Sequence, residues 1–223
     1  KRFYLKRAGL VALAGGMVVL MLLAAGGSQG TPMGLGIFTP LAITTLVVMC
    51  IVAPSSASSL IMREKEERTL GLLFLTDISG WRFVIGKLFS SLFFTVIALF
   101  SVLPLFMLVV SLGGVSAIQI GMAYVVILGA VFLCGCMGVF AACATRTERS
   151  MNGVLAGIWA ATFFLIPPAV AVAYMMKDLT PPESIGSLSS PMWAMVNVIH
   201  GREIWFGLGN ALVNVALGLP LLW

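Results

Sequence analysis

The sequence predicts an all-α, polytopic membrane protein with six transmembrane helices and a cytoplasmic helical segment between the second and the third. Hydrophobic residues make up 60% of the 223 residues, charged residues only 9%, and the mean hydropathy is +1.10. Soluble domains carry about 25% charged residues, so a water-soluble fold of this size could not bury so much apolar surface. Six apolar segments without an internal charge reach the length of roughly 20 residues that a spanning helix needs.

The six predicted spans belong to a single transmembrane domain, residues 1–223. In chain order they cover about residues 8–27, 37–62, 88–112, 117–144, 150–176 and 205–223, with a cytoplasmic loop at 63–87 and an external loop at 177–204. Backbone groups in lipid must be satisfied internally, which favours helices throughout. The basic stretch Lys1–Arg7 resembles the start of a signal peptide, but the long apolar run behind it favours a retained span.

Span two carries two prolines and a cluster of hydroxyls. Pro40 is expected in the first helical turn, where its missing N–H costs little. Pro54 is expected to kink the helix. The serines of the segment PSSASS, which starts at Pro54, could bond backbone carbonyls or line a watery groove. Bonding to the backbone, with close helix packing, is the favoured interpretation.

The later spans are rich in residues that permit close helix contact. Gly113-Gly114 is expected to turn the chain between spans three and four, and span four combines Gly, Ala and Cys. All four cysteines (Cys50, Cys134, Cys136 and Cys143) lie in apolar segments, so we expect them to act as small packing residues. Gly153-x-x-x-Gly157 in span five is a helix-contact pattern of low specificity. The apolar segment from Ser190 to Val196 is expected to be either a helix at or dipping into the interface, or an ordinary loop.

The orientation follows from the distribution of Lys and Arg. One side of the predicted topology holds eleven of them and the other only Lys177 and Arg202. The positive-inside rule therefore places the N-terminus in the cytoplasm. The net charge of +5 is explained by this topology and by attraction to anionic lipid, without a nucleic-acid partner. The eleven are Lys1, Arg2, Lys6, Arg7, Arg63, Lys65, Arg68, Arg82, Lys87, Arg146 and Arg149.

The stretch from Arg63 to Lys87 holds nine of the 21 charged residues. Its first half favours a helix that continues out of span two, supported by Glu64 and Arg68 at positions i and i+4. Leu70, Leu73 and Phe74 share one face of that helix. Helix–helix connections usually need only two to eight residues. A loop of this length and pattern therefore indicates a surface that binds another protein, rather than a simple solvated turn.

The run EKEERTLGLL from Glu64 to Leu73, with Gly86-Lys87 further on, resembles the loop of type-2 ABC transporter permeases. That family has an acidic and basic run followed by Thr-Leu after its second span, and a Gly-Lys pair that opens the third. The six-span pattern and the Ser190-Pro191 segment before the last span agree with it. The chain differs from the family pattern at Arg68, Gly71 and Asp77, where Gly, Glu and Pro are usual.

The resemblance implies the permease subunit of an ATP-driven exporter, similar to type V exporters, in the inner or plasma membrane. Two permeases, identical or different, would pair within the lipid, and separate ABC ATPase subunits would bind below them. The loop would carry a coupling helix that sits in a cleft of the ATPase subunit. ATP and Mg²⁺ would bind that partner, and this chain would hold no cofactor, metal or catalytic residue. The implied coupling residues are Glu64, Glu66, Glu67, Arg68, Thr69, Leu70, Leu73 and Phe74.

The residues themselves argue against chemistry within this chain. The nearest match to a P-loop, from Gly80 to Gly86-Lys87, has five intervening residues and Leu88 where a hydroxyl is needed. None of the predicted spans contains Asp, Glu, Lys, Arg or His, which disfavours an ion-coupled secondary transporter and an intramembrane protease. The only histidine, His200, is expected in a solvated loop. A membrane scaffold or assembly protein without transport and, less favoured, a secondary transporter are the alternative functions.

Overall fold

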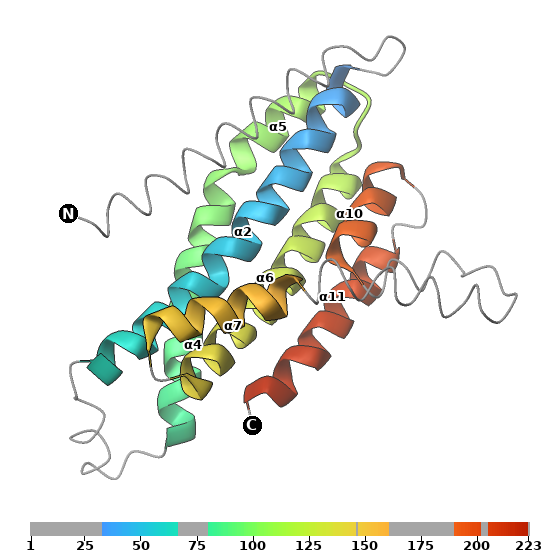
Figure 1. The fold of residues 1–223 in the computed structure, drawn as a ribbon. Coiled ribbons are helices and arrows are strands. Elements are labelled where there is room, and N and C mark those ends of the chain that lie inside the picture. Colours follow the sequence, from blue (N-terminus) through green and yellow to red (C-terminus); the bar gives the residue numbers. More distant parts are fainter. Residues whose placement is uncertain (1–32, 67–79, 146, 161–189, 202–204, 223) are drawn as a thin grey trace, which may run out of the picture.

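A computed structural model describes residues 33–66, 80–145, 147–160, 190–201 and 205–222 (Figure 1). Every regular element within these ranges is a helix, which confirms the all-α class for this part of the chain. Three helical stretches are long and apolar enough to cross a membrane: Gly34–Lys65, Gly80–Ser111 and Ala117–Ala144. The count of six spans stays a prediction, because the first predicted span and much of the fifth lie outside the described residues. The elements are α2 (Met33–Glu66), α4 (Gly80–Ser101), α5 (Leu103–Ser111), α6 (Ala117–Ala144), α7 (Glu148–Ala160), α10 (Pro191–Ile199), α11 (Trp205–Gly218) and the 3₁₀-helix η2 (Leu219–Leu222).

Helix α6 is the central element of the described bundle. It lies between α2 and the pair α10 and α11, and its most extensive contacts are with α2 and α11 (Figure 1). A capping box starts it: the Ser116 backbone N–H donates to the Gln119 side chain at 2.8 Å, and the Gln119 backbone N–H donates to Ser116 Oγ at 3.3 Å. Its small residues let neighbours approach closely, since a Cβ built on Gly129 would lie 2.6 Å from the Cα of Ala211 in α11.

Helix α2 is longer than the span predicted for it. Its 34 residues correspond to about 51 Å at 1.5 Å per residue, against a hydrocarbon core of about 30 Å. Because it begins at Met33, Pro40 lies inside the helix and not in the first turn, which corrects the expectation from the sequence. Hydroxyls lie beside this proline, as Thr39 donates to the Leu35 carbonyl at 3.0 Å and Thr44 to the Pro40 carbonyl at 2.6 Å.

The third apolar segment is two helices rather than one. Helix α4 ends at Ser101, and α5 begins at Leu103 with Pro104 in its first turn. Pro104 has no N–H to continue the helical ladder, so the chain tightens there and the Val102 N–H bonds the Leu99 carbonyl at 3.1 Å. After α5, Gly113 and Gly114 adopt φ values of 80° and 89°, which confirms the predicted turn.

The segment before the last helix is itself a helix, α10. Its Ala194, Met195 and Val198 are fully buried in the same apolar cluster as parts of α2 and α6. Near Gly207, at the start of α11, Val126 of α6 and Val198 of α10 each lie 3.2 Å from the position of a Cβ. Of the alternatives left open by the sequence, the structure therefore favours a helix buried against the bundle, beside the first half of α6, over an ordinary loop.

Candidate functional site

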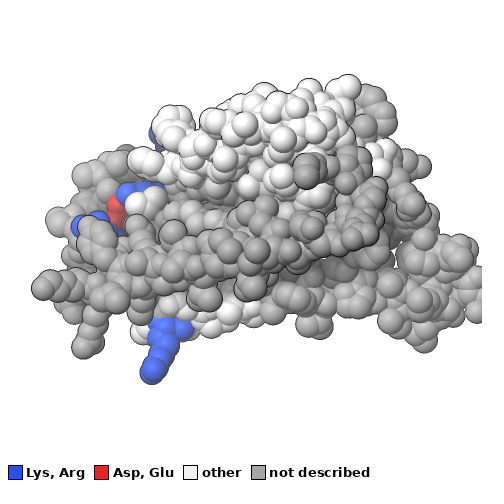
Figure 2. Space-filling view, turned by 90° about the horizontal axis from the view of Figure 1, so that it is seen from above, with Lys and Arg blue, Asp and Glu red and all other residues white. Residues whose placement is uncertain are grey.

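The charged side chains that the structure describes gather at one end of the bundle. They come from the last turn of α2, the first two turns of α4 and the start of α7, and we call this region the charged end. Figure 2 shows them at one end of the visible surface, whereas most of the other described atoms are uncharged. They are Arg63, Glu64, Lys65, Arg82, Lys87 and Arg149.

An ion pair joins the two helices that flank the predicted coupling loop. The Glu64 carboxylate near the end of α2 lies 2.5 Å from Nζ of Lys87 in α4, and the two side chains are 24% and 29% exposed. Lys87 Nζ also lies 5.7 Å from the ring centroid of Phe83. A partly exposed pair of this kind contributes about 1 kcal/mol or less to stability. The pair also has a geometric effect, because it brings the last turn of α2 next to the first part of α4.

Lys65 binds the C-terminus of α6. Its ammonium group donates to the backbone carbonyls of Ala142, Cys143 and Thr145, at 2.5, 3.1 and 3.0 Å. The last carbonyls of a helix have no partner within the helix and carry its negative dipole end. Helix α6 has no basic residue in its own last turn, so the cation is supplied by α2.

The serine cluster of α2 lies directly above the charged end. Four of its serines donate to backbone carbonyls three residues earlier in the helix, at 2.9 to 3.3 Å, which confirms the favoured interpretation. Ser56 Oγ also lies 2.8 Å from Ser91 Oγ of α4, so one polar contact joins the two helices. The four serines are Ser55, Ser56, Ser58 and Ser59.

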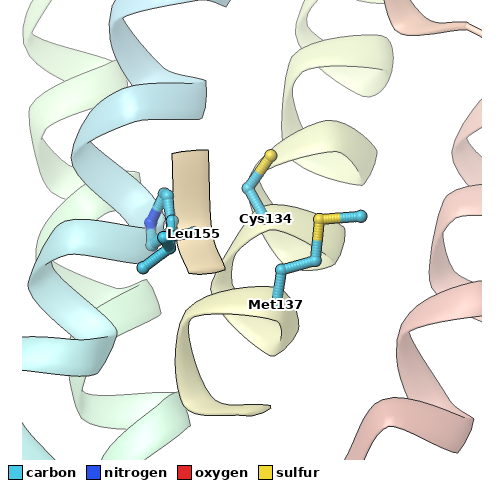
Figure 3. Close-up of a pocket in the computed structure, with 4 residues that line it drawn as sticks. Cys134, Met137 and Leu155 are labelled. Atoms are coloured by element: carbon cyan, nitrogen blue, oxygen red, sulfur yellow. The ribbon is translucent and has the colours of Figure 1, made fainter. Parts of the chain in front are cut away.

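A small apolar pocket lies where α2, α6 and α7 meet. Pro54, Cys134, Met137 and Leu155 line it, and its volume is about 160 Å³ including the open mouth. Figure 3 shows the Cys134 and Met137 side chains of α6 beside Leu155 of α7. The walls carry no charge, and binding pockets for small molecules commonly reach 300 Å³ or more. The pocket is therefore a packing gap at a helix crossing, and it offers no nucleotide site.

Three of the four cysteines confirm the expected packing role. Cys50, Cys134 and Cys136 are buried, whereas Cys143 is exposed in the last turn of α6 at the charged end. The pattern Gly153-x-x-x-Gly157 was expected to be of low specificity as a contact signal. A Cβ built on Gly153 or Gly157 meets no atom within 4 Å, so these glycines make no close crossing with the rest of the described chain.

Only part of the predicted coupling segment lies within the described residues. The structure places Glu64 in the ion pair with Lys87. Glu66 is the last residue of α2. The remaining coupling residues lie outside the described part: Glu67, Arg68, Thr69, Leu70, Leu73 and Phe74. Lys65 and Lys87 were not among the coupling residues predicted from the sequence. The sequence did carry a signal for Lys65. This lysine lies in the last turn of α2, whereas α6 has no basic residue in its own last turn to interact with its terminal carbonyls.

Comparison with known proteins identifies the family to which the chain belongs. The family described as ABC-2 family transporter protein matches residues 7–210, which is nearly the whole chain. No curated protein and no solved structure matches the chain. Members of this family are membrane components of ABC transporters that partner an ABC ATPase subunit, and they are not ATPases themselves. The long apolar helices, the charges at one end and the family match agree, and the chain therefore belongs to the ABC-2 family of transporters as a multi-pass membrane permease.

Proposed function

We propose that this permease is the transmembrane half of an ATP-driven exporter, in which the loop after α2 couples ATP hydrolysis on a separate subunit to movement of the bundle. The observation that carries this proposal is the ion pair between Glu64 and Lys87, with 2.5 Å between the charged atoms. It holds both ends of the loop together at the charged end. A segment closed at its base moves as a unit when a partner pushes on it.

The charged end faces the cytoplasm in this proposal, together with the N-terminus. The basic residues described there support that orientation under the positive-inside rule: Arg63, Lys65, Arg82, Lys87 and Arg149. Six spans, a second permease copy of the same or another kind, and two ATPase subunits complete the complex. ATP and Mg²⁺ bind the ATPase subunits.

The loop contacts the ATPase with polar groups first and an apolar anchor second. The polar contacts are made by Glu64, Glu66, Glu67, Arg68 and Thr69, and the anchor by Leu70, Leu73 and Phe74. The spacing of the three anchor residues puts them on one face of a helix. A few well-buried residues commonly carry most of the binding energy of an interface, and these three are the ones assigned that role here.

Co-purification tests the proposal. The tagged permease is expressed with candidate ABC ATPase subunits from the same organism, and the amount of ATPase that stays bound is measured after purification in detergent. We expect the double variant Leu73→Asp, Phe74→Asp to lose the ATPase. The control Leu72→Asp adds one negative charge on the opposite side of the helix from the anchor face, and this variant should retain the ATPase. Equal binding by both variants would count against docking through this face.

Measurements of transport distinguish the exporter from the two alternative functions, a scaffold and a secondary transporter. A scaffold would bind the ATPase, but blocking ATP hydrolysis in the partner would leave the transported flux unchanged. A secondary transporter would support flux in vesicles that contain this chain, an ion gradient and no ATPase. For the exporter, we expect blocked ATP hydrolysis to stop the flux, and we expect no flux in vesicles that lack the ATPase.

A further inference from the structure

The C-terminus of α6 depends on a side chain from another helix. Thr145, the residue after α6, donates two hydrogen bonds to the Ala141 carbonyl, one from its backbone N–H at 3.2 Å and one from its hydroxyl at 2.7 Å. The carbonyls of Ala142, Cys143 and Thr145 itself take their hydrogen bonds from Lys65. Hydrogen bonds from an ammonium group are about twice as strong as neutral ones.

Two consecutive residues at the end of α2 therefore reach different helices. Glu64 binds Lys87 of α4, and Lys65 binds the end of α6. Neighbours in a helix point about 100° apart, which is how one turn of α2 contacts both helices. This turn is the first part of the predicted coupling loop, residues 63–87, so the base of the loop is fixed to α4 on one side and to α6 on the other.

We propose that Lys65 is a positioning residue that transmits movement of the loop after α2 to α6, an inference that rests on the proposed function. When the ATPase displaces the end of α2, either α6 follows or three hydrogen bonds to Lys65 break. Breaking them would remove the hydrogen bonds that these carbonyls receive from Lys65. Because α6 contacts α2, α4, α7, α10 and α11, its movement is felt directly by these five helices.

Three variants separate the charge of Lys65 from its bulk. Lys65→Met keeps an unbranched stem and removes the ammonium donors. Lys65→Arg keeps a cation with several donors and should rescue the effect. Arg149→Met is the matched control, because Arg149 is an exposed cation at the same end and its loss also lowers the net charge by one.

The exposed thiol of Cys143 supplies the reporter. It lies in the last turn of α6, beside the carbonyls that Lys65 binds, whereas Cys50, Cys134 and Cys136 are buried. The rate of maleimide labelling is measured on the purified permease–ATPase complex, without nucleotide and with ATP bound to a hydrolysis-deficient ATPase. Cys143→Ser gives the background rate.

Coupling between two sites in a protein commonly amounts to a factor of 5 to 150. We therefore expect ATP to change the labelling rate of Cys143 by about fivefold or more in the wild type and in Arg149→Met. In Lys65→Met the rates with and without ATP should agree within about twofold, and Lys65→Arg should restore the difference. A residue with only a structural role would lower thermal stability and leave the response to ATP intact.

The inference is overturned if Lys65→Met keeps the full response to ATP, or if the wild type shows no response, since Lys65 would then have nothing to transmit. Both results presuppose that the ATPase is bound. An absence of the ATPase from the wild-type complex is a separate result, and it would refute the proposed function itself.

Discussion

The crossing of α2 and α6 makes a sharp prediction about a single methyl group. A Cβ at Gly138 would lie 2.5 Å from the carbonyl oxygen and 2.7 Å from the Cα of Pro54. Ordinary contacts of a Cβ begin at 3.4 Å, and both atoms belong to the backbone, so no side chain can move aside. Gly138→Ala must therefore push the two helices apart by about 0.9 Å in a close-packed interior.

The expected size of the effect follows from two opposing contributions. Alanine is favoured over glycine within a helix by about 1 kcal/mol. Inserting a methyl group into a packed contact costs about 1–3 kcal/mol. We expect Gly138→Ala to destabilise the fold by about 1–2 kcal/mol, because separating the helices also loosens contacts around Pro54. Gly121 is the control on the same helix: its Cβ position meets no atom within 4 Å, so Gly121→Ala should stabilise by up to about 1 kcal/mol.

Thermal stability in detergent measures both variants. The purified chains are heated in steps, and the temperature at which half remains monodisperse is recorded. For a chain of this size, 1 kcal/mol corresponds to a shift of about 2–4 °C. Gly138→Ala should melt below the wild type and Gly121→Ala at or above it. The same Gly→Ala substitution would then lower stability at one position of α6 and raise it at the other. A variant Gly138→Ala as stable as Gly121→Ala would refute the close crossing.

Three further predictions concern other contacts. Glu64→Gln breaks the ion pair with Lys87 but should lower stability by less than about 1 kcal/mol, because the pair is partly exposed; a melting shift above about 4 °C would contradict this. Tyr124→Phe loses only a long hydroxyl contact of 3.4 Å to a carbonyl and should melt near the wild type, whereas Tyr124→Ala removes a ring packed 5.4 Å from that of Phe106 and should cost about 3–5 kcal/mol. Maleimide under native conditions should label one thiol per chain quickly, and mass spectrometry should find it on Cys143; fast labelling of a second site would contradict the burial of the other three cysteines.

The sequence predicted the helices better than it predicted their ends and contacts. Helix α6 runs over Ala117–Ala144, the same range as the fourth apolar segment, because a capping box and the polar residues after Ala144 mark its limits. Helix α2 extends beyond its apolar segment at both ends, to Met33 and Glu66. The continuation from Arg63 to Glu66 was predicted from the charged stretch, whereas the extra residues at the N-terminal end were not. The break at Val102 was missed, although Pro104 carried the signal for it.

The candidate site was predicted in position more than in detail. The charge pattern located the coupling segment, and the structure places Glu64 in an ion pair with Lys87, which the sequence did not identify. Gly138 and Gly153 look alike in the sequence as small residues within apolar helices. Only Gly138 lies at a close crossing, against Pro54. Spacing along one helix gives the direction of a side chain, but it says nothing about which helix lies there.

The sequence alone determined that this protein is helical and lies in a membrane, because composition and hydrophobic length are properties of each segment by itself. It also predicts that most of the charge lies at one membrane boundary. The tertiary structure decided that Lys65 completes the end of α6, that Glu64 closes the base of the loop and that α10 is buried beside α6. These facts depend on groups that are far apart in the chain, such as Lys65 and the carbonyl of Ala142, which is 77 residues further on. Only the packing of the helices brings such groups within hydrogen-bonding distance.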